Sequence, residues 1–151
     1  MRIALGCDHA GYPLKVEIAK HLAEAGHEVI DFGTDTEESV DYPSYCAAVG
    51  RSVVAGEADF GLVMGGTGQG EQIAANKVHG VRAALCLDEF TARLARSHND
   101  ANVLALGGRV LAPTLACALV DVFLQTDFEG GRHARRIAQI GDIEKEECER
   151  R

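Results

Sequence analysis

Short apolar segments recur along the chain about every 25 residues and predict five buried β-strands. The predicted strands cover residues 3–6, 28–32, 60–64, 81–86 and 103–106. Between them, apolar residues recur with helical spacing, as at Leu14, Ile18 and Leu22 before Gly26. Because parallel strands need such crossover helices, the pattern predicts an α/β fold. We expect a doubly wound, five-stranded parallel sheet, Rossmann-like, with helices on both faces.

Further helical segments complete this alternation. The apolar spacing predicts helices over residues 45–55 and 113–124, and another after Asp88. The charged segment after Gly131 predicts a C-terminal helix that frays beyond about Ile143. We therefore expect a single domain over residues 1–143, followed by a C-terminal tail over residues 144–151.

Composition excludes several classes of protein. The chain has 151 residues, 46% of them hydrophobic, which is enough for one core. Its 15 Lys and Arg against 23 Asp and Glu give a net charge of -8, which argues against a nucleic-acid partner. No segment approaches the roughly 18 apolar residues of a membrane span, and the first apolar run is too short for a signal peptide, so we expect a cytoplasmic protein. The five cysteines are scattered and form no CxxC pair, which predicts reduced thiols and no zinc site.

A glycine-rich loop follows the third predicted strand and precedes a helix. Its residues are Gly65, Gly66, Thr67, Gly68, Gln69 and Gly70. Backbone N–H groups in such a loop, together with the N-terminus of a helix, suit an anion or an oxyanion. The loop matches neither the dinucleotide fingerprint nor the P-loop. The alternative is a tight turn without a ligand.

Two further groups are expected beside this loop. In a doubly wound sheet of strand order 2-1-3-4-5, the order reverses between the first and third strands, and ligands bind there, outside the carboxyl ends. Asp8 and His9 end the first strand, and Glu71 lies in the first turn of the helix after the loop. Glu71 alone is better explained as a charge that stabilises its helix, but in this sheet we expect all three residues to face one crevice.

A second set of candidates belongs to the opposite end of the sheet. His98 and Asn99 precede the fifth strand, so a second subunit must bring them to the crevice; otherwise they only cap a helix. Arg132 and Arg136 are four residues apart on one helix face, and Arg109 follows a Gly-Gly pair. These guanidinium groups suit a phosphate, the alternative being ordinary surface arginines.

The motifs occur together in a characteristic order. They are Cys7-Asp8-His9-Ala10-Gly11, Asp41-Tyr42-Pro43, Gly66-Thr67-Gly68, Ala74-Ala75-Asn76-Lys77, Ser97-His98-Asn99-Asp100-Ala101-Asn102 and Gly107-Gly108-Arg109. Up to about Ile143, the sequence resembles the type B ribose-5-phosphate isomerases and related sugar-phosphate isomerases. The resemblance implies an aldose-ketose isomerase that interconverts ribose 5-phosphate and ribulose 5-phosphate through a cis-enediolate. It also implies a homodimer with shared active sites or a tetramer, with no metal and no cofactor.

The resemblance assigns roles to individual residues. Many members use a cysteine directly before Gly-Thr-Gly as the base, but Gly65 stands there in this chain. The chain is more similar to a branch with a glutamate at the end of the loop, which implies that Glu71 is the base. The resemblance further implies that Thr67 and the amides of Gly66, Gly68, Gln69 and Gly70 stabilise the enediolate, and that His98 opens the sugar ring with help from Asp8. Substrate is bound by Asn99 and Tyr42. The phosphate is bound by His9, Arg132 and Arg136, with Arg109 nearby.

Three alternatives stay open at this point. The substrate of such an isomerase can instead be a tetrose, tetrulose or hexose phosphate, because one carbon changes binding in an apolar pocket by only about 1–3 kcal/mol. A non-catalytic sugar-phosphate-binding subunit would keep the fold without the chemistry. A flavodoxin-like binding module is disfavoured, because aromatic residues make up only 5% of the chain.

Overall fold

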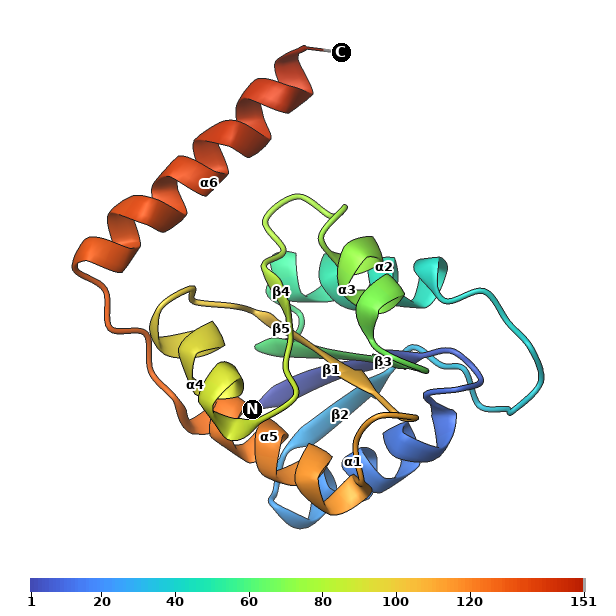
Figure 1. Cartoon of the computed structure of the whole chain (residues 1–151). Coiled ribbons are helices and arrows are strands. Elements are labelled where there is room, and N and C mark those ends of the chain that lie inside the picture. Colours follow the sequence, from blue (N-terminus) through green and yellow to red (C-terminus); the bar gives the residue numbers. More distant parts are fainter. Residues whose placement is uncertain (151) are drawn as a thin grey trace.

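The computed structural model describes residues 1–150 and shows one five-stranded sheet packed against helices (Figure 1). The elements in chain order are β1 (Arg2–Cys7), α1 (Tyr12–Glu24), β2 (Glu28–Asp31), α2 (Pro43–Val54), β3 (Phe60–Gly65), α3 (Gln69–Ala75), β4 (Ala83–Leu85), α4 (Glu89–Ser97), β5 (Val103–Gly107), α5 (Pro113–Gln125) and α6 (Arg132–Glu149). The predicted α/β class, the five strands and the C-terminal helix are confirmed.

All strand pairs are parallel, and the strands lie side by side in the order β2-β1-β3-β5-β4. The predicted reversal between β1 and β3 is confirmed, but the predicted order of the last two strands is wrong. Every residue of β5 is buried, whereas two of the three residues of β4 are partly exposed. An interior strand must be apolar on both faces. The fully apolar β5 therefore takes the interior position, and the short β4 forms the edge.

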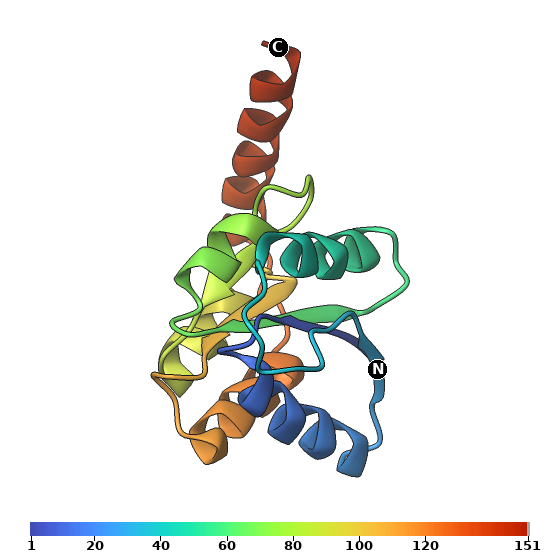
Figure 2. The ribbon, with the colours of Figure 1, turned by 90° about the vertical axis from the view of Figure 1, so that its right-hand side faces the viewer.

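Each face of the sheet has its own core. Helices α1, α4 and α5 cover one face, where Ile18 and Phe123 belong to the same buried core as Leu62 of β3. Helices α2 and α3 cover the other face, where Val49 packs near Val63 of β3. Figures 1 and 2 show these two helical layers on opposite sides of the strands. Consecutive residues of β3 thus serve opposite cores, as the alternation of side chains along a strand requires.

The starts of several helices follow from local sequence. All three prolines, Pro13, Pro43 and Pro113, lie in the first turn of a helix. Proline is tolerated there because the N–H that it lacks would have no partner within the helix. Helix α4 is instead capped by Asp88, the residue before it, whose carboxylate accepts a hydrogen bond of 2.7 Å from the amide of Thr91.

Helix α6 extends away from the rest of the molecule (Figure 1). Its one buried residue is His133, whereas Ile140 and Ile143 are more than half exposed. The helix continues to Glu149 rather than fraying beyond Ile143 as the sequence predicts. Its second half contacts the loop before β4, where Glu144 accepts a hydrogen bond of 3.1 Å from the amide of Gly80.

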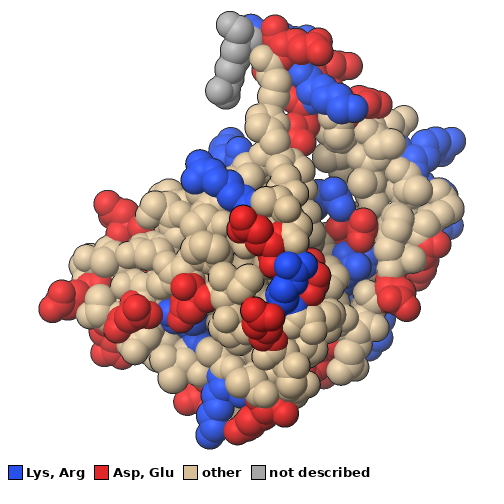
Figure 3. Space-filling view, turned by 180° about the vertical axis from the view of Figure 1, so that it is seen from behind, with Lys and Arg blue, Asp and Glu red and all other residues tan. Residues whose placement is uncertain are grey.

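The surface is charged but mixed in sign. On the face in Figure 3, lysine and arginine side chains are interspersed with aspartate and glutamate rather than forming a continuous basic strip. Within residues 1–150, no helix combines the length and the apolar character that a membrane span requires.

Candidate functional site

The loop after β3 lies against the loop after β5. Two backbone hydrogen bonds join them, from the amide of Gly108 to the carbonyl of Gly65 at 2.8 Å and from the amide of Arg109 to the carbonyl of Gly66 at 3.0 Å. Gly68 has a φ of 81°, in the left-handed region that favours glycine, and it is the residue before α3. The loop is therefore held in a fixed conformation at the carboxyl end of the central strands.

Glu71 lies in the first turn of α3, as predicted, and its side chain is almost completely buried, with 4% of the residue exposed. A Cβ built on Gly65 would overlap its carboxylate, so the absence of a side chain at position 65 makes this placement possible. Burial raises the pKa of Glu71 above the ordinary value, and the negative charge of Asp8 adds to this increase. A carboxylate with a raised pKa is suited to accept a proton from a weak carbon acid.

The side chain of Asp8 lies near Glu71, just beyond the carboxyl end of β1. Its Oδ1 accepts hydrogen bonds of 2.9 Å from the amides of both Ala10 and Gly11, at the start of α1. Its own amide donates to the carbonyl of Met64 in β3. Both carboxylates therefore lie at the carboxyl ends of β1 and β3, where the sequence predicts a crevice.

Thr67 and Tyr42 lie beside the same loop. The Oγ1 atom of Thr67 accepts a hydrogen bond of 3.3 Å from the amide of Gln69, which keeps this hydroxyl at the tip of the loop. The ring of Tyr42 packs on Gly70, where a Cβ would come within 2.6 Å of the tyrosine hydroxyl. Both residues are thus at the predicted site.

Two candidates for anion binding lie at the same end of the sheet. The guanidinium of Arg109 is next to the loop, with Nη1 3.3 Å from the position of a Cβ built on Gly66. His9 follows Asp8, and its Nδ1 accepts a hydrogen bond of 3.2 Å from the amide of Val40. The structure therefore brings Arg109 to the glycine-rich loop and holds His9 at the end of β1.

The remaining candidates form a second cluster, at the amino end of β5. His98 is the C-terminal cap of α4, and its ring stacks on that of His133, with the centroids 4.1 Å apart. Burial lowers the pKa of His133 below the ordinary value, and the positive charges of His98, Arg132 and Arg136 lower it further. Both arginines thus lie near His133, at the start of α6.

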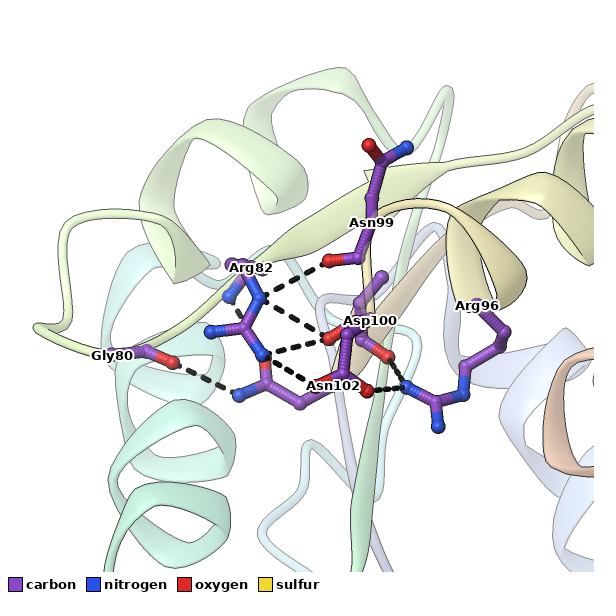
Figure 4. A network of polar contacts seen from close by, with 7 residues as sticks. Gly80, Arg82, Arg96, Asn99, Asp100 and Asn102 are labelled. Carbon is purple, nitrogen blue, oxygen red and sulfur yellow. Dashed lines mark hydrogen bonds and ion pairs between the residues drawn. The ribbon is translucent and has the colours of Figure 1, made fainter. Parts of the chain in front are cut away.

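The loop that carries His98 and Asn99 is fixed by a polar network (Figure 4). The carboxylate of Asp100 accepts hydrogen bonds from Arg96 at 2.8 Å and from Arg82 at 3.2 Å. Arg82 also donates to the backbone carbonyl of Asn99 at 3.2 Å. The side-chain amide of Asn99 points away from this network in Figure 4, which leaves it available for another partner.

The two clusters lie at opposite ends of one sheet. Glu71 follows the carboxyl end of β3, whereas His98 precedes the amino end of the neighbouring β5. Strands of five or six residues separate these ends by roughly 17–20 Å, which is too far for one small sugar to touch both. The candidate residues of one chain therefore form two separate groups.

Sequence reasoning missed two residues of the second cluster, His133 and Glu129. One carboxylate oxygen of Glu129 lies 3.8 Å from Nε2 of His98 and 3.7 Å from Nε2 of His133. Glu129 and His133 are four residues apart, a spacing that is typical of side chains in contact on a helix. Their approach to His98 depends on the tertiary structure.

Together, the groups support acid-base chemistry on an anionic substrate. A buried carboxylate with a raised pKa can remove a proton beside a carbonyl group, and backbone amides in a fixed loop can stabilise the oxyanion that results. Arginines in an otherwise acidic chain can hold a phosphate through charge-assisted hydrogen bonds.

Comparison with known proteins agrees with this chemistry. A family model described as Ribose/Galactose Isomerase matches residues 3–140. Ribose-5-phosphate isomerase B of Escherichia coli (strain K12) is 50% identical over 144 residues, which cover 95% of this chain and 97% of that protein.

Solved structures show the same fold over nearly the whole chain. Ribose-5-phosphate isomerase B of Clostridium thermocellum has a TM-score of 0.96 and 55% identity, covering 97% of this chain and 99% of that one. The enzyme of Mycoplasma genitalium with bound ribulose-5-phosphate has a TM-score of 0.91 and 43% identity, covering 96% and 97%. The chain therefore belongs to the ribose/galactose isomerase family.

Proposed function

We propose that this protein interconverts ribose 5-phosphate and ribulose 5-phosphate through a cis-enediolate, with Glu71 as the base. The observation that carries the proposal is the buried carboxylate of Glu71 beside the glycine-rich loop, with a pKa above the ordinary value. The choice of pentose phosphate is supported by the relatives, which are named ribose-5-phosphate isomerase B, one of them with bound ribulose-5-phosphate.

The proton transfer needs one base. Glu71 removes the proton from carbon 2 of the open-chain aldose and returns it to carbon 1, while the hydroxyl proton of carbon 2 passes to the oxygen on carbon 1, and these two transfers give the ketose. The negative charge that develops on the substrate oxygen is stabilised by the amides of Gly66, Gly68, Gln69 and Gly70 and by the hydroxyl of Thr67. Because these steps use only proton transfer and fixed donors, we expect no metal and no cofactor.

The other residues bind the sugar and open its ring. His98 acts in ring opening, assisted by Asp8 at the ring oxygen or a hydroxyl group. Asn99 binds the hydroxyl groups along the sugar, and Tyr42 lines the pocket. The phosphate is held by His9, Arg132 and Arg136, with Arg109 nearby.

This assignment requires a second copy of the chain, because His98 and Glu71 lie at opposite ends of the sheet. In a two-fold homodimer, His98 of one chain reaches the Glu71 site of the other, and two equivalent sites form. Exposed apolar side chains are available for such an interface, including Phe90, Ile140 and Ile143. A tetramer would be formed by two such dimers.

A substrate panel tests the proposed function. Purified protein is assayed in excess chelator with four-, five- and six-carbon aldose and ketose phosphates, and ribose 5-phosphate should have the highest kcat/KM. Glu71→Gln should lower turnover by about 100-fold or more, because it removes the base. Glu57→Gln, at an exposed glutamate, is the matched control and should keep full turnover. Binding of sugar phosphate without turnover would instead identify a non-catalytic subunit.

A further inference from the structure

His98, His133 and Glu129 form a compact group of potential metal ligands. Each offers one ligand atom, and these atoms lie within 4.8 Å of one another. Both imidazole Nε2 atoms approach the same carboxylate oxygen of Glu129, at 3.8 Å from His98 and 3.7 Å from His133. Two ligands about 2.1 Å from a tetrahedral ion are about 3.4 Å apart, so the two pairs that Glu129 forms with His98 and His133 have to close by only a few tenths of an ångström. The ligand atoms of the two histidines lie within 4.8 Å of each other and have to approach further.

One member of the group is a buried polar atom without a partner. His133 is 7% exposed, and its Nε2 has no hydrogen-bond partner in the structure. A buried nitrogen of this kind loses the hydrogen bonds that water gives it in the unfolded chain. An ion bound between His133 and Glu129 would satisfy it.

The chemistry of the group selects the kind of ion. Two imidazoles and one carboxylate suit Zn²⁺ or a similar transition-metal ion, whereas Mg²⁺ and Ca²⁺ prefer oxygen ligands. The two rings stack with an angle of 15° between their planes, so one ring has to turn for both nitrogens to point at one ion. The side chain of His98 is 32% exposed and therefore has room to turn, whereas His133 is held by burial.

Another group of similar composition lies farther along α6. The thiol of Cys148 is 3.2 Å from a ring nitrogen of His79, and Glu144 is 3.6 Å from the same ring. The side chain of His79 is 69% exposed, and none of these three contributes a buried polar atom without a partner. This group provides the matched control.

We propose that His98, Glu129 and His133 bind one Zn²⁺ ion per chain and that the bound ion inhibits the enzyme. The inhibition rests on the proposed function, in which His98 opens the sugar ring. Coordination uses the lone pair of the His98 nitrogen and turns its ring, so the side chain no longer exchanges a proton with the substrate. Zinc then acts as a reversible inhibitor of an isomerase that needs no metal.

Direct binding tests the site without reference to activity. Isothermal titration of the chelator-treated full chain with zinc chloride, in phosphate-free buffer, should give one ion per chain. Glu129→Gln and His133→Gln should each weaken zinc affinity by at least about tenfold, because each removes a ligand. If His133→Gln fails to fold, Glu129→Gln still tests the zinc site, because the side chain of Glu129 is 58% exposed and its replacement does not disturb the core.

The control is the double variant His79→Gln/Cys148→Ser, which should bind zinc with the affinity of the wild type. The proposed site is wrong if Glu129→Gln binds zinc as tightly as the wild type, or if only the control variant loses the ion.

Inhibition is measured separately with ribose 5-phosphate. Saturating zinc should lower wild-type turnover by about 100-fold or more, the contribution typical of an acid-base group, and excess chelator should restore it. At a zinc concentration that half-saturates the wild type, Glu129→Gln should lose at most about a tenth of its turnover, because its affinity is at least about tenfold weaker. Full wild-type turnover with zinc bound would disprove the inhibitory role. An absence of isomerase activity would count against the proposed function alone, because the titration decides the zinc site independently.

Discussion

The carboxylate of Glu71 occupies the space that a side chain at Gly65 would fill. Position 65 is where the resemblance to sugar-phosphate isomerases places a cysteine base in many members. The proposed base Glu71 thus reaches the point that a side chain at position 65 would occupy, although the two positions are six residues apart in the sequence. Glycine at position 65 and glutamate at position 71 are therefore coupled, because a side chain at the first excludes the buried position of the second.

Adding a methyl group at this point tests the coupling. Gly65→Ala should displace the Glu71 carboxylate and lower turnover by about 100-fold or more. It should also destabilise the protein by about 1–3 kcal/mol, as overpacking of a buried position does. Urea denaturation and steady-state assays measure the two effects. The double variant Gly65→Ala/Glu71→Ala should recover the stability but not the activity. If the double variant is no more stable than Gly65→Ala, the overlap of the two side chains is not the cause of the lost stability.

The raised pKa of Glu71 makes both stability and activity depend on pH. Because the folded protein binds this proton more tightly than the unfolded chain, the contribution of Glu71 to stability is full below the ordinary carboxyl pKa. It is lost as pH rises through the raised pKa. Glu71→Gln should therefore increase the free energy of unfolding more at pH 7 than at pH 4. The acid limb of kcat/KM in the wild type should lie above the ordinary pKa of a glutamate.

Urea denaturation at the two pH values measures this difference, with Glu57→Gln as the control that should show none. An equal effect of Glu71→Gln at both pH values would contradict the raised pKa.

The first turns of α6 contain two arginines that we expect to bind phosphate and one that we do not. Arg132→Ala and Arg136→Ala should each raise KM by about 10- to 100-fold, which corresponds to a hydrogen bond to a charged group of about 1.5–3 kcal/mol. Some loss of kcat should follow, since phosphate binding also positions the reacting carbons. Arg135→Ala, at an exposed position between them, should leave KM unchanged in the same assay. If all three variants keep the KM of the wild type, Arg132 and Arg136 are ordinary surface charges.

Shared sites predict complementation between inactive chains. Glu71→Gln and His98→Ala proteins should each be inactive. After subunit exchange, half of the dimers in an equal mixture should be heterodimers with one intact site each, so activity should return to about a quarter of the wild-type value. Sedimentation and assays on the same samples measure exchange and recovery together. Exchange without recovery, or a fully active monomer, would contradict the shared-site dimer.

The cysteines should be dispensable for catalysis. Burial raises the pKa of Cys7 and Cys46 to about 12 and that of Cys86 to about 11, so these thiols remain protonated at neutral pH. Cys148 is exposed. Iodoacetamide should therefore modify Cys148 first, as mass spectrometry can show, with little loss of turnover, and Cys148→Ser should abolish this rapid labelling. Fast inactivation that substrate prevents would indicate an essential thiol instead.

The sequence alone determined the elements of the fold and one half of the site. Periodic apolar residues such as Leu14, Ile18 and Leu22 predict α1, because burial of one helix face requires this spacing. A glycine-rich loop after a strand predicts a backbone turn with free amides for the same kind of local reason. Asp8 and Glu71 could be placed in one crevice because the reversal of strand order between β1 and β3 brings their loops together.

Only the tertiary structure decided the lateral order of β4 and β5, the burial of Glu71 in the space left by Gly65, and the stacking of His98 on His133. Hydrophobic periodicity reports which face of an element is buried, but not which neighbour covers it. The first feature depends on the competition of two strands for the interior of the sheet. The other two depend on contacts between residues that are distant in sequence or on the exact volume left by a missing side chain. Such properties belong to the packed molecule and have no local signature along the chain.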